Sequence, residues 1–150
     1  MFLHYELLDK KEDLIKYFDE LCEGARLMID KTGGHGQSAE LIIKMMMTMI
    51  EKEECFLLVG LDEDEVFQGF AFAIYITGKP GWVDFIGMWS QPGVAREVRF
   101  EVFELLHKWA VGHGACKILA GITRSPRVFY RFFHKPLGFK PVGLILEYEL

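Results

Sequence analysis

One carboxylate stands alone in a long apolar stretch of the sequence. Asp84 is the only Asp or Glu between Glu65 and Glu97, and its surroundings alternate in the manner of a strand. An isolated carboxylate among apolar residues costs free energy unless it is paired or takes part in function. Alternation places it on one face with Trp82, Ile86 and Met88. The alternative is an Asp near the exposed end of the strand that is hydrogen-bonded to the turn.

The C-terminal third of the chain is basic. Residues 105–150 carry seven Lys or Arg and two Glu, whereas residues 1–65 carry seven Lys or Arg and 16 Asp or Glu. Arg124, Arg127 and Arg131 recur at nearly helical spacing and could share a face. Such a one-sided field suits an anionic ligand, although simple solvation of these side chains would give the same counts. The net charge of −5 argues against nucleic acid as the ligand.

The composition predicts one folded domain that spans residues 1–150. Hydrophobic residues make up 51% of the chain, which is too many for intrinsic disorder. The three cysteines are far apart and the five histidines have no ligand spacing, so neither a disulfide framework nor a metal site is expected. No signal peptide and no apolar run near the ~20 residues of a membrane span is present. We therefore expect a cytoplasmic protein that does not bind membranes.

The periodicity predicts elements that would position these residues. A short strand at residues 2–8 is followed by a helix to about Ile29, a glycine-rich loop at residues 31–37 and a second helix capped by Ser38. Strands are predicted at residues 55–61, 66–77 and 82–89. A helix from about Val98, a strand at residues 115–123, a short helix to about His134 and a strand at residues 142–150 complete the order. The strand, helix and strand between residues 82 and 123 form a β-α-β crossover with parallel strands.

The end of the chain carries the most specific local pattern. Residues 129–141 read FYRFFHKPLGFKP, which is a short helix followed by Leu-Gly-Phe, and the chain closes with LEYEL. Together with the element order, this resembles the GNAT superfamily of N-acetyltransferases over nearly the whole chain. The resemblance implies an α/β (α+β) fold. Its sheet would be mixed and mostly antiparallel, with a central pair of parallel, splayed strands and helices on both faces.

The resemblance also implies a site for acetyl-CoA. In that family the cosubstrate lies between the two splayed strands, and its pyrophosphate binds backbone N–H groups where the central helix begins. A helix N-terminus suits phosphate, because it offers unpaired donors and a partial positive charge. The residues implied to bind the cofactor are Met88, Trp89, Ser90, Gln91, Gly93, Val94, Ala95, Arg96, Arg99 and Arg127.

The turn at residues 91–96 departs from the family pattern, which is Gln or Arg, two residues, Gly, any residue, then Gly or Ala. Aligned at Gln91, the chain has Val94 and Arg96 at the two small positions. Aligned at the end of the helix, it has Glu97 and Arg99 there. Either basic residues hold the phosphates in an altered turn, or the chain is a catalytically inactive GNAT-fold binding or structural module.

Acetyl transfer to an amine requires a base, a polarised thioester carbonyl and an acid for the leaving thiolate. By resemblance, backbone N–H groups of residues 88–90 polarise the carbonyl and Asp84 is the base. The acid is Tyr130 on the short helix, although His134 stands closer to the spacing from Gly138 that is usual in the family. Packing of the Tyr and solvation of the His are the structural alternatives.

The resemblance implies an acetyl-CoA-dependent N-acetyltransferase that acts on a primary amine. The acidic residues 1–65 would favour a cationic acceptor, and His35 in the glycine-rich loop is a candidate contact to it. A nucleic-acid-binding module that uses residues 105–146 is a weaker alternative. An extended C-terminal edge strand could support a homodimer.

Overall fold

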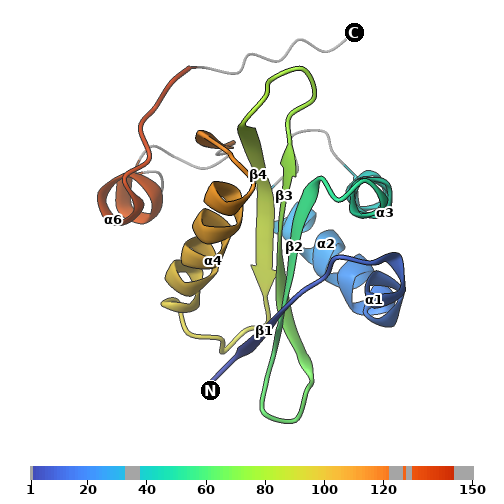
Figure 1. The fold of residues 1–150 in the computed structure, drawn as a ribbon. Coiled ribbons are helices and arrows are strands. Elements are labelled where there is room, and N and C mark those ends of the chain that lie inside the picture. The colour runs from blue at the N-terminus through green and yellow to red at the C-terminus, as the bar shows by residue number, and fades with distance from the viewer. Residues whose placement is uncertain (1, 33–37, 122–126, 128–129, 144–150) are drawn as a thin grey trace, which may run out of the picture.

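The protein folds around one sheet with helices on both faces (Figure 1). The computed structural model describes residues 2–32, 38–121, 127 and 130–143. The sheet has the order β1-β2-β3-β4-β5. Its strands are β1 (His4–Leu7), β2 (Cys55–Leu61), β3 (Phe67–Tyr75), β4 (Trp82–Ser90) and β5 (Lys117–Ala120). This mixed α/β architecture is the fold class that the sequence predicts.

Neighbouring strands from β1 to β4 pair antiparallel, whereas β4 and β5 pair parallel. The chain passes from β4 to β5 through α4 (Val98–Gly112). The predicted β-α-β crossover is therefore confirmed. Strand β5 is shorter than the predicted range of residues 115–123, of which residues 122 and 123 lie outside the described part of the chain.

The core forms two layers, one on each side of the sheet. Every residue of β2 is buried, because its alternate side chains enter different layers. Leu57 and Val59 pack with α1, α2 and α3, while Phe56 and Leu58 pack with Val102, Leu106 and Ala110 of α4. Figure 1 shows α4 on one side of the sheet and the three N-terminal helices on the other.

The predicted first helix is divided in two. It consists of α1 (Lys11–Lys16) and α2 (Phe18–Thr32). At Tyr17 the backbone N–H donates to the Leu14 carbonyl three residues back, and the hydroxyl donates to the Glu6 carboxylate at 2.9 Å. This tighter turn rotates the side chains of α2 relative to those of α1. Phe18, which the periodicity places in the core, is 37% exposed as a result.

The second predicted helix is α3 (Ala39–Glu51). Its predicted cap is confirmed, because the Ser38 hydroxyl oxygen accepts the backbone N–H of Leu41 at 3.1 Å. Ile42 and Met46 are buried, as predicted, and Met45 and Met49 pack against the same core while partly exposed.

The described C-terminal part packs outside α4. A π-helical segment η2 (Tyr130–His134) leads into α6 (Lys135–Leu137). The helix continues through Pro136, where the sequence predicts its end, and Gly138 ends it with a left-handed φ of 76°. The Phe139 ring lies 5.3 Å from the Phe103 ring of α4. Most of the predicted last strand, residues 144–150, lies outside the described residues.

The close approach of β3 and β4 gives a first prediction. A Cβ atom at Gly69 would lie 2.4 Å from the Trp89 carbonyl oxygen, so the backbone must shift to accept one. Gly69→Ala should lower the free energy of unfolding by about 1–3 kcal/mol, as measured by urea denaturation. The matched control is Gly112→Ala in α4, where no atom lies within 4 Å of the added methyl. It should leave stability unchanged or raise it by up to about 1 kcal/mol; equal losses in both variants would contradict the explanation.

Candidate active site

The two parallel strands share only part of their length. Residues Trp82 to Phe85 of β4 pair with Lys117 to Ala120 of β5. Strand β4 continues to Ser90, and no described residue pairs with its second half on that edge. Backbone N–H and C=O groups on such an edge are available to an extended ligand.

An irregularity in β4 occurs where the strands part. Phe72 of β3 pairs with Gly87 and Ala73 pairs with Phe85, so that Ile86 is an extra residue in β4. A bulge of this kind reverses the alternation of side chains beyond it. Met88 therefore packs in the α4 layer, whereas Ile86 packs in the layer of α2 and α3. The prediction that Met88 shares a face with Asp84 is wrong for this reason.

Asp84 lies before the bulge and is partly buried. It pairs with Ile74 of β3 on one side and with Leu119 of β5 on the other. Burial raises the pKa of its carboxyl above the ordinary value, because loss of solvent penalises the charged form. A carboxyl whose pKa is raised by burial is a candidate for proton transfer. Asp84 does not line the hollow described next.

A hollow of about 880 Å³ lies where β4 ends and α4 begins. Its wall is formed by Met88, Trp89 and Ser90 of β4, the turn that follows, and the start of α4. It is closed on another side by Leu27, Asp30 and Lys31 of α2. Apart from Arg127, every residue predicted to bind the cofactor lines this hollow, so the structure brings together residues 88–91, 93–96 and 99.

The turn between β4 and α4 presents backbone donors to this hollow. Gly93 has a φ of 96°, a left-handed conformation that favours glycine, and a Cβ atom there would meet nothing within 4 Å. The Gln91 N–H donates to the Gln68 carbonyl at 2.8 Å, which fixes the start of the turn. The N–H groups of Gly93, Ala95 and Arg96 make no hydrogen bond to another described residue. They remain available to an anion.

The charged side chains of the hollow are mostly basic. Lys31, Arg96 and Arg99 line it, and the carboxylate of Asp30 is paired with Arg26 at 2.9 Å. Glu97 occupies the N-cap position of α4, is exposed and is not part of the lining. Its carboxylate therefore does not stand where the second alignment of the turn placed it. The arrangement suits a ligand with several negative charges.

The C-terminal candidates are described only in part. Arg127 is exposed and does not line it, and Tyr130 lies in η2, with a side chain outside the described part. The Nδ1 of His134 donates to the Phe139 carbonyl at 2.5 Å. That bond commits one ring nitrogen of His134 to holding the turn at Gly138. His35 lies outside the described residues.

Sequence reasoning missed the contribution of α2 to the hollow. Lys31 and Asp30 stand far from the turn in the sequence, and only the packing of α2 against β4 brings them to it. The sequence places Lys31 in the glycine-rich loop, whereas in the structure it belongs to the last turn of α2. The charge counts also gave no indication that α2 contributes a basic residue to the hollow, because residues 1–65 as a whole are acidic.

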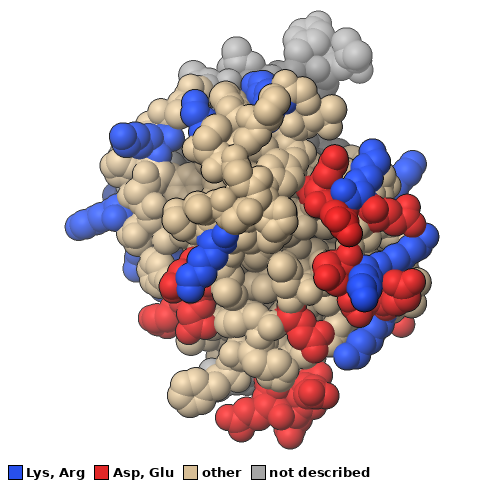
Figure 2. All heavy atoms as spheres, in the orientation of Figure 1, with Lys and Arg blue, Asp and Glu red and all other residues tan. Residues whose placement is uncertain are grey.

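The charge distribution on the surface follows the sequence. Figure 2 shows Asp and Glu interspersed with Lys and Arg over the N-terminal helices, and a cluster of Asp and Glu alone at the lower end, by the β2–β3 hairpin. Toward the upper left, Lys and Arg are the only charged residues in this view. In the described part of the chain, no group of three or more His, Cys, Asp or Glu side chains could hold a metal ion. None of its helices is long and apolar enough to cross a bilayer.

Comparison with solved structures identifies the fold. An acetyltransferase described as predicted, from Clostridium acetobutylicum with acetyl-CoA, superposes with a TM-score of 0.74 at 12% identity, over 99% of this chain and 96% of that one. The aminoglycoside acetyltransferase AAC(6')-Iy, in complex with a bisubstrate analog of CoA, gives 0.68 at 14% identity over 100% and 99%. The chain has the GNAT acetyltransferase fold. No protein-family model and no curated protein matches the sequence.

A further neighbour extends the comparison within the GNAT fold. The aminoglycoside 6'-N-acetyltransferase AAC(6')-Ih from Acinetobacter baumannii has a TM-score of 0.66 at 11% identity, over 99% of this chain and 98% of that one. These neighbours are acetyltransferases and some were solved with CoA or acetyl-CoA. At such identities the likeness is one of fold, so the residues of this chain must carry the functional argument.

The burial of Asp84 predicts a pH-dependent stability. Its folded pKa lies above the unfolded value of 3.8, so ionisation opposes folding when the pH is above the raised pKa, and this cost is absent below the unfolded pKa. Asp84→Asn should therefore raise the free energy of unfolding at pH 7, and the gain should vanish as the pH falls toward 3.8. Urea denaturation between pH 3 and pH 8 measures it. Asp9→Asn, at an exposed position, should stay within about 0.5 kcal/mol throughout; a constant gain in Asp84→Asn would contradict the explanation.

Proposed function

We propose that this protein is an acetyl-CoA-dependent N-acetyltransferase that acetylates a primary amine. The observation that supports it most is the hollow at the end of the parted strands, where Lys31, Arg96 and Arg99 surround unpaired backbone donors. A pyrophosphate and a further phosphate require such a combination. Neighbours with the same fold that were solved with CoA or acetyl-CoA add to it.

The binding mode follows from the order of the groups along β4. The phosphates would lie at the turn that contains Gly93, where N–H groups and basic side chains meet. The extended thiol arm would run along the free edge of β4 beyond Ile86, using backbone groups that β5 leaves without partners. The thioester would then reach the bulge, where backbone N–H groups of residues 88–90 on the free edge would polarise its carbonyl.

The transfer needs a neutral amine. The nitrogen lone pair attacks the thioester carbonyl carbon, the C–N bond forms, the C–S bond breaks and the thiolate leaves. The proton lost by the amine passes to the Asp84 carboxylate, directly or through water, and the thiolate takes a proton from Tyr130. His134 is the alternative acid. The raised pKa of Asp84 makes its carboxylate a stronger base than an exposed one.

A cationic acceptor suits the charge of this protein. Carboxylates gather over the N-terminal helices and the β2–β3 hairpin, which would attract a polyamine or another amine with several positive charges. The acceptor of the AAC(6') neighbours is an aminoglycoside by name. We also propose that the protein works in the cytoplasm and forms a homodimer.

One observation favours a second function. Arg96 and Val94 stand where the family pattern has small residues, and a bulky turn keeps a phosphate farther from the backbone. The second candidate is therefore a GNAT-fold module that binds another partner without catalysis. Binding of acetyl-CoA separates the two.

Calorimetric titration with acetyl-CoA and with CoA tests the proposal directly. We expect micromolar dissociation constants for both ligands. Arg96→Glu and Lys31→Glu should each weaken binding at least about tenfold, since each replaces an attraction to phosphate by a repulsion. Lys52→Glu makes the same charge change at an exposed position outside the hollow and should change the constant less than about twofold. The absence of binding at millimolar ligand would sink the acetyltransferase proposal.

Steady-state kinetics on a panel of amines tests the acid. Tyr130→Phe removes the phenolic proton and should lower kcat by about 10²-fold while the KM for acetyl-CoA stays nearly constant. His134→Ala should instead mainly lower stability, because it removes the hydrogen bond to the Phe139 carbonyl. A loss of kcat in His134→Ala alone, at unchanged stability, would transfer the role from Tyr130 to His134.

A further inference from the structure

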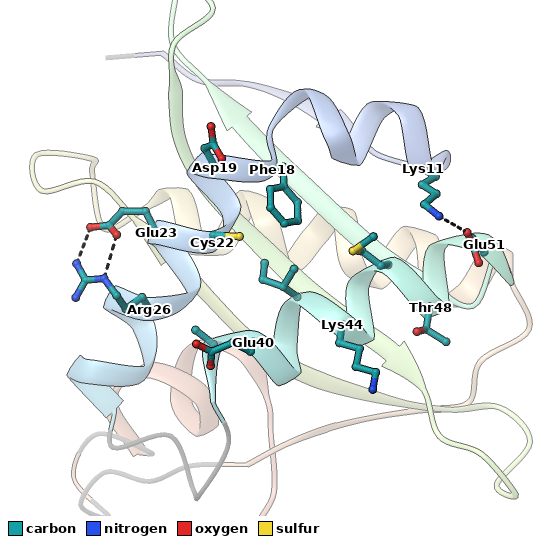
Figure 3. A pocket seen from close by; sticks show the side chains of 13 residues that line it. Lys11, Phe18, Asp19, Cys22, Glu23, Arg26, Glu40, Lys44, Thr48 and Glu51 are labelled. Atoms are coloured by element: carbon teal, nitrogen blue, oxygen red, sulfur yellow. Dashed lines mark hydrogen bonds and ion pairs between the residues drawn. The ribbon is translucent and has the colours of Figure 1, made fainter.

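A second hollow lies on the outer side of the N-terminal helices. It occupies about 760 Å³ between α2 and α3, and α1 closes one end through Lys11. Figure 3 shows Phe18 and Cys22 of α2 pointing toward α3. Ile43 and Met47 of α3 complete an apolar floor. This groove, lined by 13 residues from Lys11 to Glu51, shares no lining residue with the hollow at the end of β4.

The charges around the groove fall into two groups. Near its two ends, Lys11 pairs with Glu51 at 2.9 Å and Arg26 pairs with Glu23 at 2.6 Å. The other carboxylates of the lining, Asp19 and Glu40, have no ion-pair partner among the described residues. Ion pairs thus leave the negative charge of the groove concentrated on these two residues.

Asp19 and Glu40 stand on opposite helices, α2 and α3. Both carboxylates, together with burial, raise the pKa of the Cys22 thiol on the floor, burial having the largest effect. The carboxylates of α2 and α3 therefore both act on the same side chain of the groove floor, Cys22. Lys44 also belongs to the lining, but its side chain points away from α2 (Figure 3). The groove thus combines an apolar floor with unpaired carboxylates at its exposed rim.

We propose that this groove binds an amphipathic organic cation, namely a small amine with an aromatic or alkyl body. The body would lie on Phe18, Ile43 and Met47, and the ammonium group would lie toward the carboxylates at the rim, Asp19 and Glu40. The volume is within the range of small-molecule sites, which are mostly apolar with a few placed polar groups. The charge complementarity selects a cation, and the apolar floor selects against a fully hydrated inorganic ion. The inference does not depend on the proposed acetyl transfer, since the two hollows are lined by different residues.

Alkylation of Cys22 reports on this groove. Of the three cysteines, Cys55 is buried and Cys116 is exposed elsewhere, so the Cys22 peptide is distinguished by mass spectrometry of the full chain after treatment with N-ethylmaleimide. The probe is 4-phenylbutylamine, with 4-phenylbutan-1-ol and 4-phenylbutyrate as uncharged and anionic analogues of similar shape. We expect the amine to slow alkylation of Cys22 in a saturable way while Cys116 is unaffected. Acetyl-CoA at saturation should not change the midpoint.

Charge variants test the role of the carboxylates. Asp19→Asn and Glu40→Gln should each raise the dissociation constant of the amine about threefold to fivefold, as for partly exposed ion pairs. Glu20→Gln is the matched control, because Glu20 is exposed, lies beside Asp19 in the first turn of α2 and does not line the groove. It should leave the constant unchanged.

Three results would overturn the proposal. The first is equal protection of Cys22 by the alcohol or by the carboxylate, which would show that the charge is not used. The second is an equal loss of affinity in Glu20→Gln. The third is protection by a basic amphipathic peptide in the absence of any protection by the amine, which would make the groove a protein-docking surface. Loss of acetyl-CoA binding with intact protection would affect the proposed function alone.

Discussion

The arrangement of the site depends on the point at which β4 and β5 separate, because backbone hydrogen bonds between the two strands end there. A parallel pair satisfies the backbone only while the strands run together, and here the pairing involves Trp82 to Phe85 of β4. Beyond the extra residue Ile86, the edge of β4 has no strand beside it in the described structure. Helix α4 begins just after this unpaired edge, so exposed backbone groups and a helix N-terminus meet in one place. The hollow at the end of β4 is the geometric result.

Charge then distinguishes this hollow from the groove between α2 and α3. Lys31, Arg96 and Arg99 make the first attractive to anions, whereas Asp19 and Glu40 make the second attractive to cations. Helix α2 contributes to both. Arg26 lies between them in the chain and contacts Glu23 at 2.6 Å and Asp30 at 2.9 Å, so it reduces the carboxylate charge that each hollow would otherwise present.

The sequence predicted the helices and strands well where the apolar residues of a segment follow a single helix or strand period. The sequence correctly predicted three features: the buried strand at residues 55–61, the cap at Ser38 and the crossover through α4. The turn at residues 91–96 was located through the resemblance to the GNAT family, and the structure places it between β4 and α4. The sequence did not predict which face of the sheet Met88 occupies. A bulge that inserts one residue does not change the alternation of residue types along the strand. Lys31 was missed because its contact with the turn arises from the packing of α2 against β4.

The connectivity of the sheet also bears on the order in which the protein assembles. Strands β2, β3 and β4 follow one another through short hairpins, so their contacts are local in sequence and form quickly. Strand β5 can join only after the chain has passed through α4. It is short and, like β1, makes only four residue pairings, fewer than β2 makes with β3 or β3 with β4. Opening of β5 should therefore be a local event that leaves the hairpins intact, and amide exchange at Ile118 and Leu119 should run faster than at Leu57 and Val59.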